Sequence, residues 1–178
     1  LTILESTKIE NREFLNTYFD IGLWARYFAL TDLLELFHGA KLKSVRFYLN
    51  TSTGLIEPIF YDGHLVTGAL KDFHLSDFYI KNNQIINCKF MCEDRPFIER
   101  FFGSKNNPNQ QFYDIYIKTL EKFTKKENLA DLKKLWDELR VERGILYREL
   151  WRKDSVWHMG FLPHVAPWKP LEKRIFQV

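Results

Sequence analysis

The sequence predicts an α+β fold that is mainly helical, with a small β-hairpin directly after a central buried helix. Two patterns support this class: long segments with apolar residues at helical spacing, and one pair of short β-branched and aromatic segments around a turn. Hydrophobic residues make up 46% of the 178-residue chain and aromatic residues 16%, which is enough for a substantial core. The same composition excludes a disordered tail and a collagen-like fibre.

Residues 11–38 are predicted to form one long helix. Leu23, Tyr27 and Leu30 recur at steps of four and three, so they lie on one face. Other apolar residues cover the remaining sides, and a helix that is apolar nearly all round belongs inside a domain.

One carboxylate interrupts this apolar helix. Asp32 falls opposite the main stripe, where an isolated buried charge is costly. Asp32 is therefore expected either to be catalytic or to pair with Arg26, Arg46 or a backbone group.

A hairpin is predicted to follow the helix. Gly39 is expected to end the helix in a left-handed cap, and a short polar link over residues 40–44 follows. Residues 45–49 are β-branched and aromatic, as is typical of a strand, and residues 55–61 predict a second strand. Residues 50–54 between them are turn formers.

The later part of the chain is predicted to be helical. Asp94 is expected to cap a helix over residues 95–102, and amphipathic helices are expected over residues 110–126 and 129–151. Residues 156–178 contain three prolines and predict an extended tail.

Charge and hydropathy exclude two classes of partner. The net charge is only +3, and basic residues are scattered among acidic ones apart from a run of lysines over residues 122–134. Such a run is typical of a solvated helix face, so we expect no nucleic-acid partner. No stretch of about 18 apolar residues occurs, so we expect no membrane span.

Residues 23–63 have the order of a kinase-type phosphoryl-transfer site: a buried helix, a short basic loop, a two-stranded hairpin and then Asp62-Gly63. Mg²⁺ prefers hard oxygen ligands such as carboxylates, which suits Asp62 as a metal ligand. Gly63 would let the backbone turn sharply beside the metal.

The same block resembles the CotH family, the spore-coat-protein-H-like atypical kinases. The residues that carry the resemblance are 24–34 (WARYFALTDLL), 38–39 (HG), 45–50 (VRFYLN), 55–59 (LIEPI) and 61–63 (YDG). The resemblance implies a kinase-like C-terminal, catalytic lobe that binds ATP with Mg²⁺ and phosphorylates hydroxyl groups of proteins, including spore-coat proteins. It also implies that the carboxylate after the hairpin is the metal-binding acid.

Kinase catalytic loops place a base Asp, a Lys two residues later and a metal-binding Asn five residues after the Asp. By that spacing Gly39 takes the Asp position, Lys41 the Lys position and Ser44 the Asn position. Ser44 would ligate Mg²⁺ through its hydroxyl, and Lys41 would bind the nucleotide and neutralise developing phosphate charge. Because glycine cannot act as a base, Asp32 and His38 are the candidates to orient or deprotonate a hydroxyl.

Structural roles are the alternatives for these residues. His38 at a helix end is suited to capping, Lys41 and Lys43 to a solvated loop, and Asp62-Gly63 alone to an ordinary turn.

The block begins near residue 20, so the chain is expected to be a single CotH-like domain over residues 1–178 that lacks an N-terminal lobe. A non-catalytic, pseudokinase-like interaction module that has lost the loop Asp is the alternative function.

Overall fold

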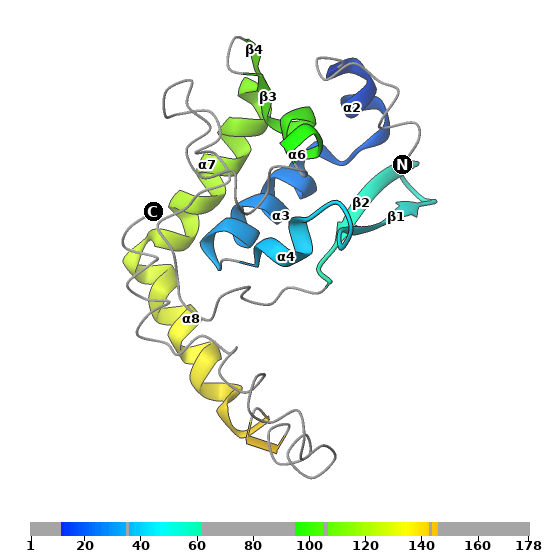
Figure 1. The fold of residues 1–178 in the computed structure, drawn as a ribbon. Coiled ribbons are helices and arrows are strands. Elements are labelled where there is room, and N and C mark those ends of the chain that lie inside the picture. Colours follow the sequence, from blue (N-terminus) through cyan, green and yellow to red (C-terminus); the bar gives the residue numbers. More distant parts are fainter. Residues whose placement is uncertain (1–11, 35, 62–94, 105–106, 143, 146–178) are drawn as a thin grey trace.

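The computed structural model describes residues 12–34, 36–61, 95–104, 107–142 and 144–145, and within them the fold is α+β and mainly helical, as predicted (Figure 1). The helices are α2 (Arg12–Tyr18), α3 (Ile21–Leu33), α4 (Phe37–Ala40), α6 (Arg95–Phe102), α7 (Gln110–Thr124) and α8 (Lys126–Glu138). The strands are β1 (Arg46–Asn50), β2 (Leu55–Ile59), β3 (Gly103–Ser104) and β4 (Asn107–Pro108), in two separate antiparallel pairs. Asp62, Gly63, Asp94 and the expected tail over residues 156–178 lie outside the described residues.

The prediction of one helix over residues 11–38 is wrong, because the chain breaks twice there. The first break is at Phe19, which is 2% exposed and forms a bridge with Ile56 of β2. Because Phe19 is buried in the core and pairs with Ile56, it does not continue the helix, and α2 ends at Tyr18. The Asp20 carboxylate then accepts a hydrogen bond from the Leu23 N–H at 2.8 Å and starts α3 as an N-cap.

The second break separates α3 from the short helix α4 and changes the role of Gly39. The Leu36 N–H donates to the Thr31 carbonyl at 2.8 Å, five residues back, which ends the regular helical ladder. The predicted left-handed cap at Gly39 is wrong, because Gly39 is buried inside α4. Among the described glycines, those with a positive φ are Gly54 and Gly103.

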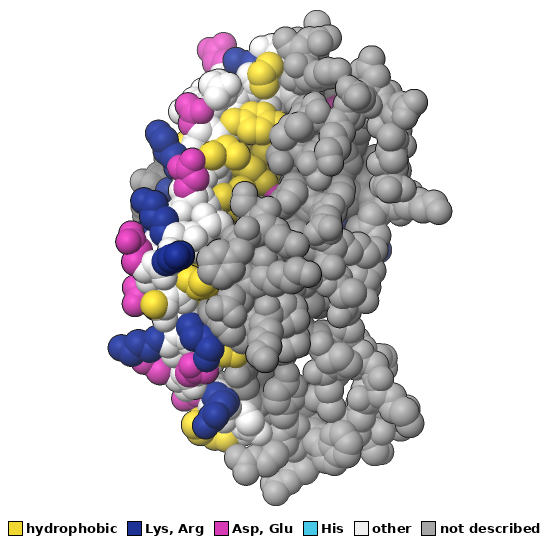
Figure 2. Space-filling model, turned by 90° about the vertical axis from the view of Figure 1, so that its left-hand side faces the viewer, with side chains coloured by type: hydrophobic (Ala, Val, Ile, Leu, Met, Phe, Trp, Pro, Cys, Tyr) yellow, Lys and Arg dark blue, Asp and Glu magenta, His cyan; other side chains and the backbone are white. Residues whose placement is uncertain are grey.

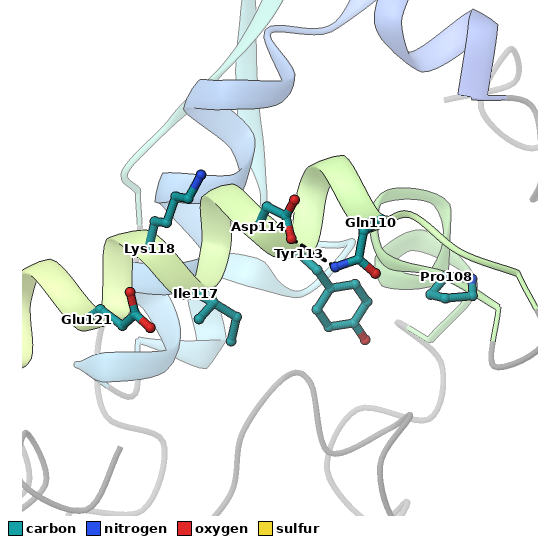
Figure 3. Close-up of a pocket in the computed structure, with 7 residues that line it drawn as sticks. All are labelled: Pro108, Gln110, Tyr113, Asp114, Ile117, Lys118 and Glu121. Carbon is teal, nitrogen blue, oxygen red and sulfur yellow. Dashed lines mark hydrogen bonds between the residues drawn. The ribbon is translucent and has the colours of Figure 1, made fainter.

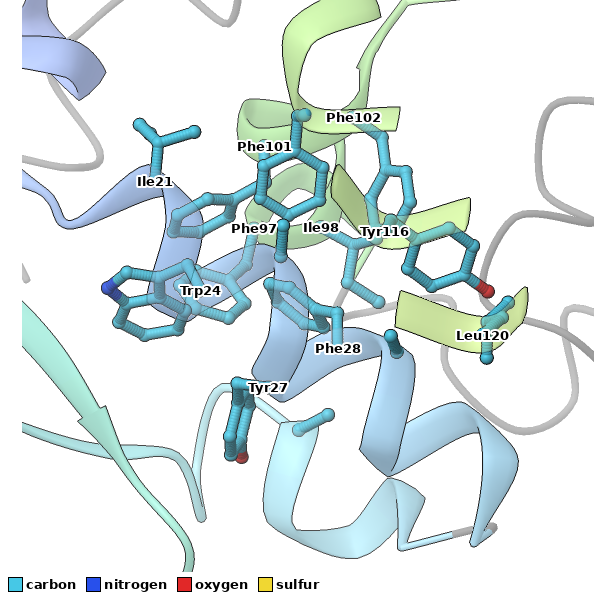
Figure 4. Close-up of a cluster of buried hydrophobic side chains, with 14 of the residues drawn as sticks. Ile21, Trp24, Tyr27, Phe28, Phe97, Ile98, Phe101, Phe102, Tyr116 and Leu120 are labelled. Carbon is cyan, nitrogen blue, oxygen red and sulfur yellow. The ribbon is translucent and has the colours of Figure 1, made fainter. Parts of the chain in front are cut away.

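An aromatic core surrounds α3 (Figure 4). Trp24 and Phe28 are fully buried, and the Trp24 ring stacks on Phe101 of α6 with centroids 4.7 Å apart. Phe28 also contacts Phe102 and, at 6.0 Å between centroids, Phe112 of α7. Aromatic pairs of this kind contribute roughly 0.5–1.5 kcal/mol each beyond their area burial. The rings therefore hold α6 and α7 against α3.

The most buried face of α3 is not the stripe that begins at Leu23. Leu23 and Leu30 are half-buried, whereas Trp24, Phe28 and Asp32 are fully buried. Indole and phenyl rings bury more apolar area than leucine does, so turning them inward gains more free energy. Asp32 lies on this face and is carried into the core with them.

Helix α7 starts at a cap that also ties it to α6. The Asn109 side chain accepts from the Phe112 N–H at 3.3 Å and donates to the Phe101 carbonyl at 3.0 Å. At the other end, the extended backbone of Lys125 separates α7 from α8. The predicted helix boundaries at residues 126 and 129 are shifted accordingly.

The β1–β2 hairpin follows α4 as predicted. Tyr48 and Glu57 lie opposite each other in its antiparallel register, and Gly54 has a φ of 73° in the turn. The Trp24 indole N–H donates to the Ile56 carbonyl at 2.9 Å. The hairpin is therefore attached directly to the core.

The two positive-φ glycines allow a matched test of backbone strain. A Cβ on Gly103 (φ +83°) would lie 2.4 Å from the Asn107 carbonyl oxygen, whereas a Cβ on Gly54 (φ +73°) would meet nothing within 4 Å. Both alanine variants carry a left-handed cost of about 1–2 kcal/mol. In urea melts we expect Gly103→Ala to lower the free energy of unfolding by at least about 1 kcal/mol more than Gly54→Ala. Equal losses would contradict this account of the β3–β4 turn.

Candidate functional site

The link between α4 and β1 carries the predicted site residues Lys41 and Ser44, and His38 lies just before it in α4. The N–H groups of Ser44 and Val45 both donate to the Lys41 carbonyl, at 2.8 and 2.7 Å, which folds the link into a tight turn. The turn brings Ser44 Oγ to 3.4 Å from Nδ1 of His38. Ser44 is 5% exposed and His38 is half-buried. The structure therefore brings a hydroxyl and an imidazole together at this link.

Lys41 lies between these two residues in the chain. It is half-buried, and its extended backbone (φ −68°, ψ 140°) ends α4. The exposed Lys43 follows in the same turn. The link thus places two ammonium groups in the segment that holds the His38–Ser44 contact, which favours an anionic ligand there.

Gly39, at the position where kinases have their base, contributes only backbone. Its carbonyl accepts a hydrogen bond from the Tyr27 hydroxyl at 2.9 Å. Burial raises the pKa of Tyr27 to about 12, although a hydrogen bond with Thr31 acts in the opposite direction. The Tyr27 hydroxyl therefore stays protonated at neutral pH and remains a donor to α4.

Asp32 lies elsewhere, in the buried contact between α3 and α7. Asp32 and Tyr116 are both 0% exposed, and the Tyr116 hydroxyl donates to the Asp32 carboxylate. The partners predicted from the sequence, Arg26 and Arg46, are both exposed. A base must reach the hydroxyl of a protein substrate, and full burial does not suit that task. We therefore assign Asp32 a structural role.

Asp62, the predicted metal ligand, lies outside the described residues, but its neighbour Tyr61 is described. The Arg46 guanidinium lies over the Tyr61 ring, 5.0 Å from its centroid. Nη1 of the same group donates to the carbonyls of Ser44 and Val45 at 3.1 and 3.0 Å. Arg46 therefore holds the chain after β2 beside the link that carries Ser44.

The described residues do not form a magnesium site by themselves. Mg²⁺ takes a near-octahedral set of oxygen ligands, and within the His38–Ser44 contact the only side-chain oxygen is Ser44 Oγ. In the described part of the chain, no cluster of three or more His, Cys, Asp or Glu side chains could hold a metal ion. Ser44 therefore fits one ligand position, and a metal there would also require the carboxylate predicted at residue 62.

A second polar cluster, not predicted from the sequence, lies on the hairpin. Glu57 is 9% exposed and accepts hydrogen bonds from the Tyr48 hydroxyl and, at 2.6 Å, from the Asn50 amide. These two bonds, that of Tyr48 first, hold the pKa of Glu57 below its ordinary value. The same contact raises the pKa of Tyr48. This cluster could be predicted from the sequence only if the strand register were known, because it depends on Tyr48 lying opposite Glu57.

A groove of about 540 Å³ lies along the exposed side of α7 (Figure 3). In the wall of this groove, the Gln110 side-chain amide donates a hydrogen bond at 2.8 Å to the carboxylate of Asp114, one helical turn further along α7. Burial raises the pKa of the Tyr113 hydroxyl in the same groove. Of the predicted site residues that the structure describes, none lines this groove. The residues that line the groove are Pro108, Gln110, Tyr113, Asp114, Ile117, Lys118 and Glu121.

Basic and acidic side chains alternate along α7 and α8 (Figure 2). Lys133 pairs with Asp137, and Lys134 lies 3.9 Å from Glu138, each pair one helical turn apart. Such exposed pairs contribute about 0.3–0.5 kcal/mol each. The lysine run is therefore a solvated helix face, as predicted. No helix in the described ranges is long and apolar enough to cross a membrane.

Comparisons with known protein families, with curated proteins and with solved structures give no match for this chain.

The buried Asp32–Tyr116 contact predicts a large cost for losing one hydroxyl. Tyr116→Phe removes the donor to a fully buried carboxylate, whereas Tyr27→Phe removes a buried donor to a neutral carbonyl. We expect Tyr116→Phe to lower the free energy of unfolding by about 1.5–3 kcal/mol and Tyr27→Phe by about 0.5–1.5 kcal/mol. Denaturant melts measure both. A larger loss for Tyr27→Phe would contradict the role assigned to Asp32.

The Glu57 cluster predicts a pH-dependent contribution to stability. The pKa of Glu57 in the folded protein is lowered from its ordinary value of 4.5. The ionised carboxylate therefore contributes fully to the free energy of unfolding above pH 4.5, and this contribution is lost as the pH falls through the lowered pKa. We therefore expect the difference in free energy of unfolding between wild type and Glu57→Gln to shrink between about pH 7 and about pH 3.

The control for this measurement is the Tyr48→Phe background, which lacks the hydrogen bond that lowers the pKa most. There the pH dependence of the Glu57→Gln difference should be smaller. A difference that does not change with pH in the wild-type background would contradict the proposed cause.

Proposed function

We propose that this protein is a kinase of the CotH type that transfers phosphate from MgATP to hydroxyl groups of a protein substrate. The observation that supports the proposal best is the contact of His38 with Ser44, 3.4 Å apart, in the basic link between a buried helix and the hairpin. In the sequence, Asp62 comes shortly after that hairpin, in the order that phosphoryl-transfer sites use.

Lys41, Ser44 and His38 each have a role in this proposal. MgATP supplies the phosphoryl group, and phosphoryl transfer depends on positioning and charge stabilisation more than on covalent chemistry. Lys41 would stabilise negative charge on the phosphates, and Ser44 would offer one oxygen ligand to the metal beside Asp62. His38 would orient or deprotonate the substrate hydroxyl, because it is half-buried and at the link, whereas Asp32 is buried in the core.

The second candidate function is a non-catalytic, pseudokinase-like interaction module. Two observations favour it: the position of the kinase base is occupied by Gly39, whose carbonyl is bound by Tyr27, and the nearby acid Asp32 is bound by Tyr116. Both candidates share the scaffold, and they differ in whether phosphate is transferred.

Thermal melts with and without MgATP test for a nucleotide site. A ligand at a concentration of 100 Kd stabilises the folded state by about 2.7 kcal/mol, which is roughly 5–10 °C in Tm for a chain of this size. We expect this shift in the wild type and its loss in Asp62→Ala. The matched control is Asp131→Ala, an exposed acid on α8, which should keep the shift. No shift in the wild type would overturn the kinase proposal.

Phosphate transfer then separates the two candidates. With radiolabelled ATP and casein or the protein itself as acceptor, a kinase transfers label, and His38→Ala should reduce the rate by roughly 10²–10⁴-fold. Asp32→Asn, which keeps the shape of the buried side chain, should leave transfer measurable at a temperature where it is folded. MgATP binding without transfer would favour the interaction module.

A further inference from the structure

Exposed apolar side chains gather on the β1–β2 hairpin and on the two residues after it. They are Phe47, Tyr48, Leu49, Ile59, Phe60 and Tyr61, which we call the hairpin surface, and their exposed fractions range from 37% for Phe47 to 59% for Leu49. Side chains alternate between the two faces of a strand, so Phe47 and Leu49 lie on one face of the sheet, whereas Tyr48 and Ile59 lie on the other. Both faces of the hairpin therefore carry exposed apolar side chains, more than the single exposed apolar residues that are ordinary on proteins. In Figure 1 the hairpin stands at one side of the helices, away from α7 and α8.

Within the described residues, strand β1 forms the unpaired edge of this sheet. The far side of β2 is occupied, because the Ile56 carbonyl accepts from the Asp20 N–H at 3.2 Å and from the Trp24 indole at 2.9 Å. The sheet consists of β1 and β2 alone in the part of the chain that is described, so no described strand lies beyond β1. Four of the five side chains of β1 are exposed. An edge of this kind is a template for a further strand.

The charge of the hairpin surface indicates the sign of its partner. Glu57 is the only acidic residue between residues 41 and 61, and its carboxylate is bound by Tyr48 and Asn50. Within residues 41–61 the exposed charged side chains are the cations Lys43 and Arg46. An apolar surface flanked by positive charge complements an apolar segment that carries acidic side chains.

A peptide fits this surface better than a nucleic acid does. Binding to a phosphate backbone draws on many cations, whereas within residues 41–61 the exposed cations are Lys43 and Arg46 alone. Bases stack on aromatic rings, whereas Leu49 and Ile59 are aliphatic. Aliphatic and aromatic side chains along an edge strand are typical of sites where an extended peptide adds to a sheet.

We propose that β1 binds an extended segment of a protein partner, rich in aliphatic residues and carrying Asp or Glu, as an additional strand. Binding of such a peptide does not require the protein to be a kinase. If the bound segment belongs to the protein substrate, this surface selects the substrate, and that part of the proposal rests on the kinase function.

The test is selection of a random peptide library against the full chain without nucleotide, followed by fluorescence anisotropy with the enriched peptides. We expect enriched peptides that combine Val, Ile or Leu with Asp or Glu and that bind at least about tenfold more weakly when their acids are replaced by Lys. We also expect amide hydrogen exchange in residues 46–50 to slow when such a peptide is bound.

Variants locate the binding. The double variant Phe47→Ser/Leu49→Ser should weaken peptide binding at least about tenfold. The single variant Leu49→Lys, which keeps Phe47, should have the same effect and replaces the double variant if that does not fold. The matched control is Leu135→Ser on α8, where the leucine is 51% exposed, and it should leave the affinity unchanged.

Three results would overturn the proposal: no enriched peptide, enriched peptides that are insensitive to the hairpin variants, or binding of oligothymidine that is lost in those variants. Because no nucleotide is present, a failure here leaves the MgATP melts and the kinase proposal untouched. Absence of a MgATP shift equally leaves the peptide result standing.

Discussion

The Trp24 side chain joins the two parts of this fold. Its ring stacks on Phe101 and so fixes α6 against α3, while its indole N–H donates to the Ile56 carbonyl and so fixes the hairpin. An aromatic ring with a polar edge can do both, because one end is apolar and the other needs a partner when buried. Helix α7 then closes over the same cluster through Phe112.

The candidate site depends on this core although it lies outside it. Phe37 and Ala40 of α4 and Val45 after the link are all buried, so the link is held at both ends by packing. Short turns between two packed elements have little freedom to rearrange, and that fixes His38 and Ser44 relative to each other. The site is therefore positioned by apolar contacts, while its chemistry comes from a few polar groups in a loop.

Local patterns predicted the fold class, the hairpin and α6, because turn residues and β-branched runs act over a few neighbouring positions. The break at Phe19 was not predictable in this way, since it depends on a bridge to Ile56, far along the chain. For the same reason the sequence predicts that Asp32 is buried and needs a partner but does not identify Tyr116. Of the site, the sequence pattern placed His38 at the end of a helix and Ser44 in the link that follows it, whereas their side-chain contact depends on the turn at Lys41.

The Asp32–Tyr116 hydrogen bond joins residues 84 positions apart, so one partner is synthesised well before the other. During synthesis at about 5–20 residues per second, α3 leaves the ribosome roughly 4–17 s before the part of α7 that covers it. For that time Asp32 lacks the Tyr116 hydroxyl, and Phe28 lacks the Phe112 ring. Among the contacts of α3 described above, those with α7 are therefore the last whose residues are all synthesised.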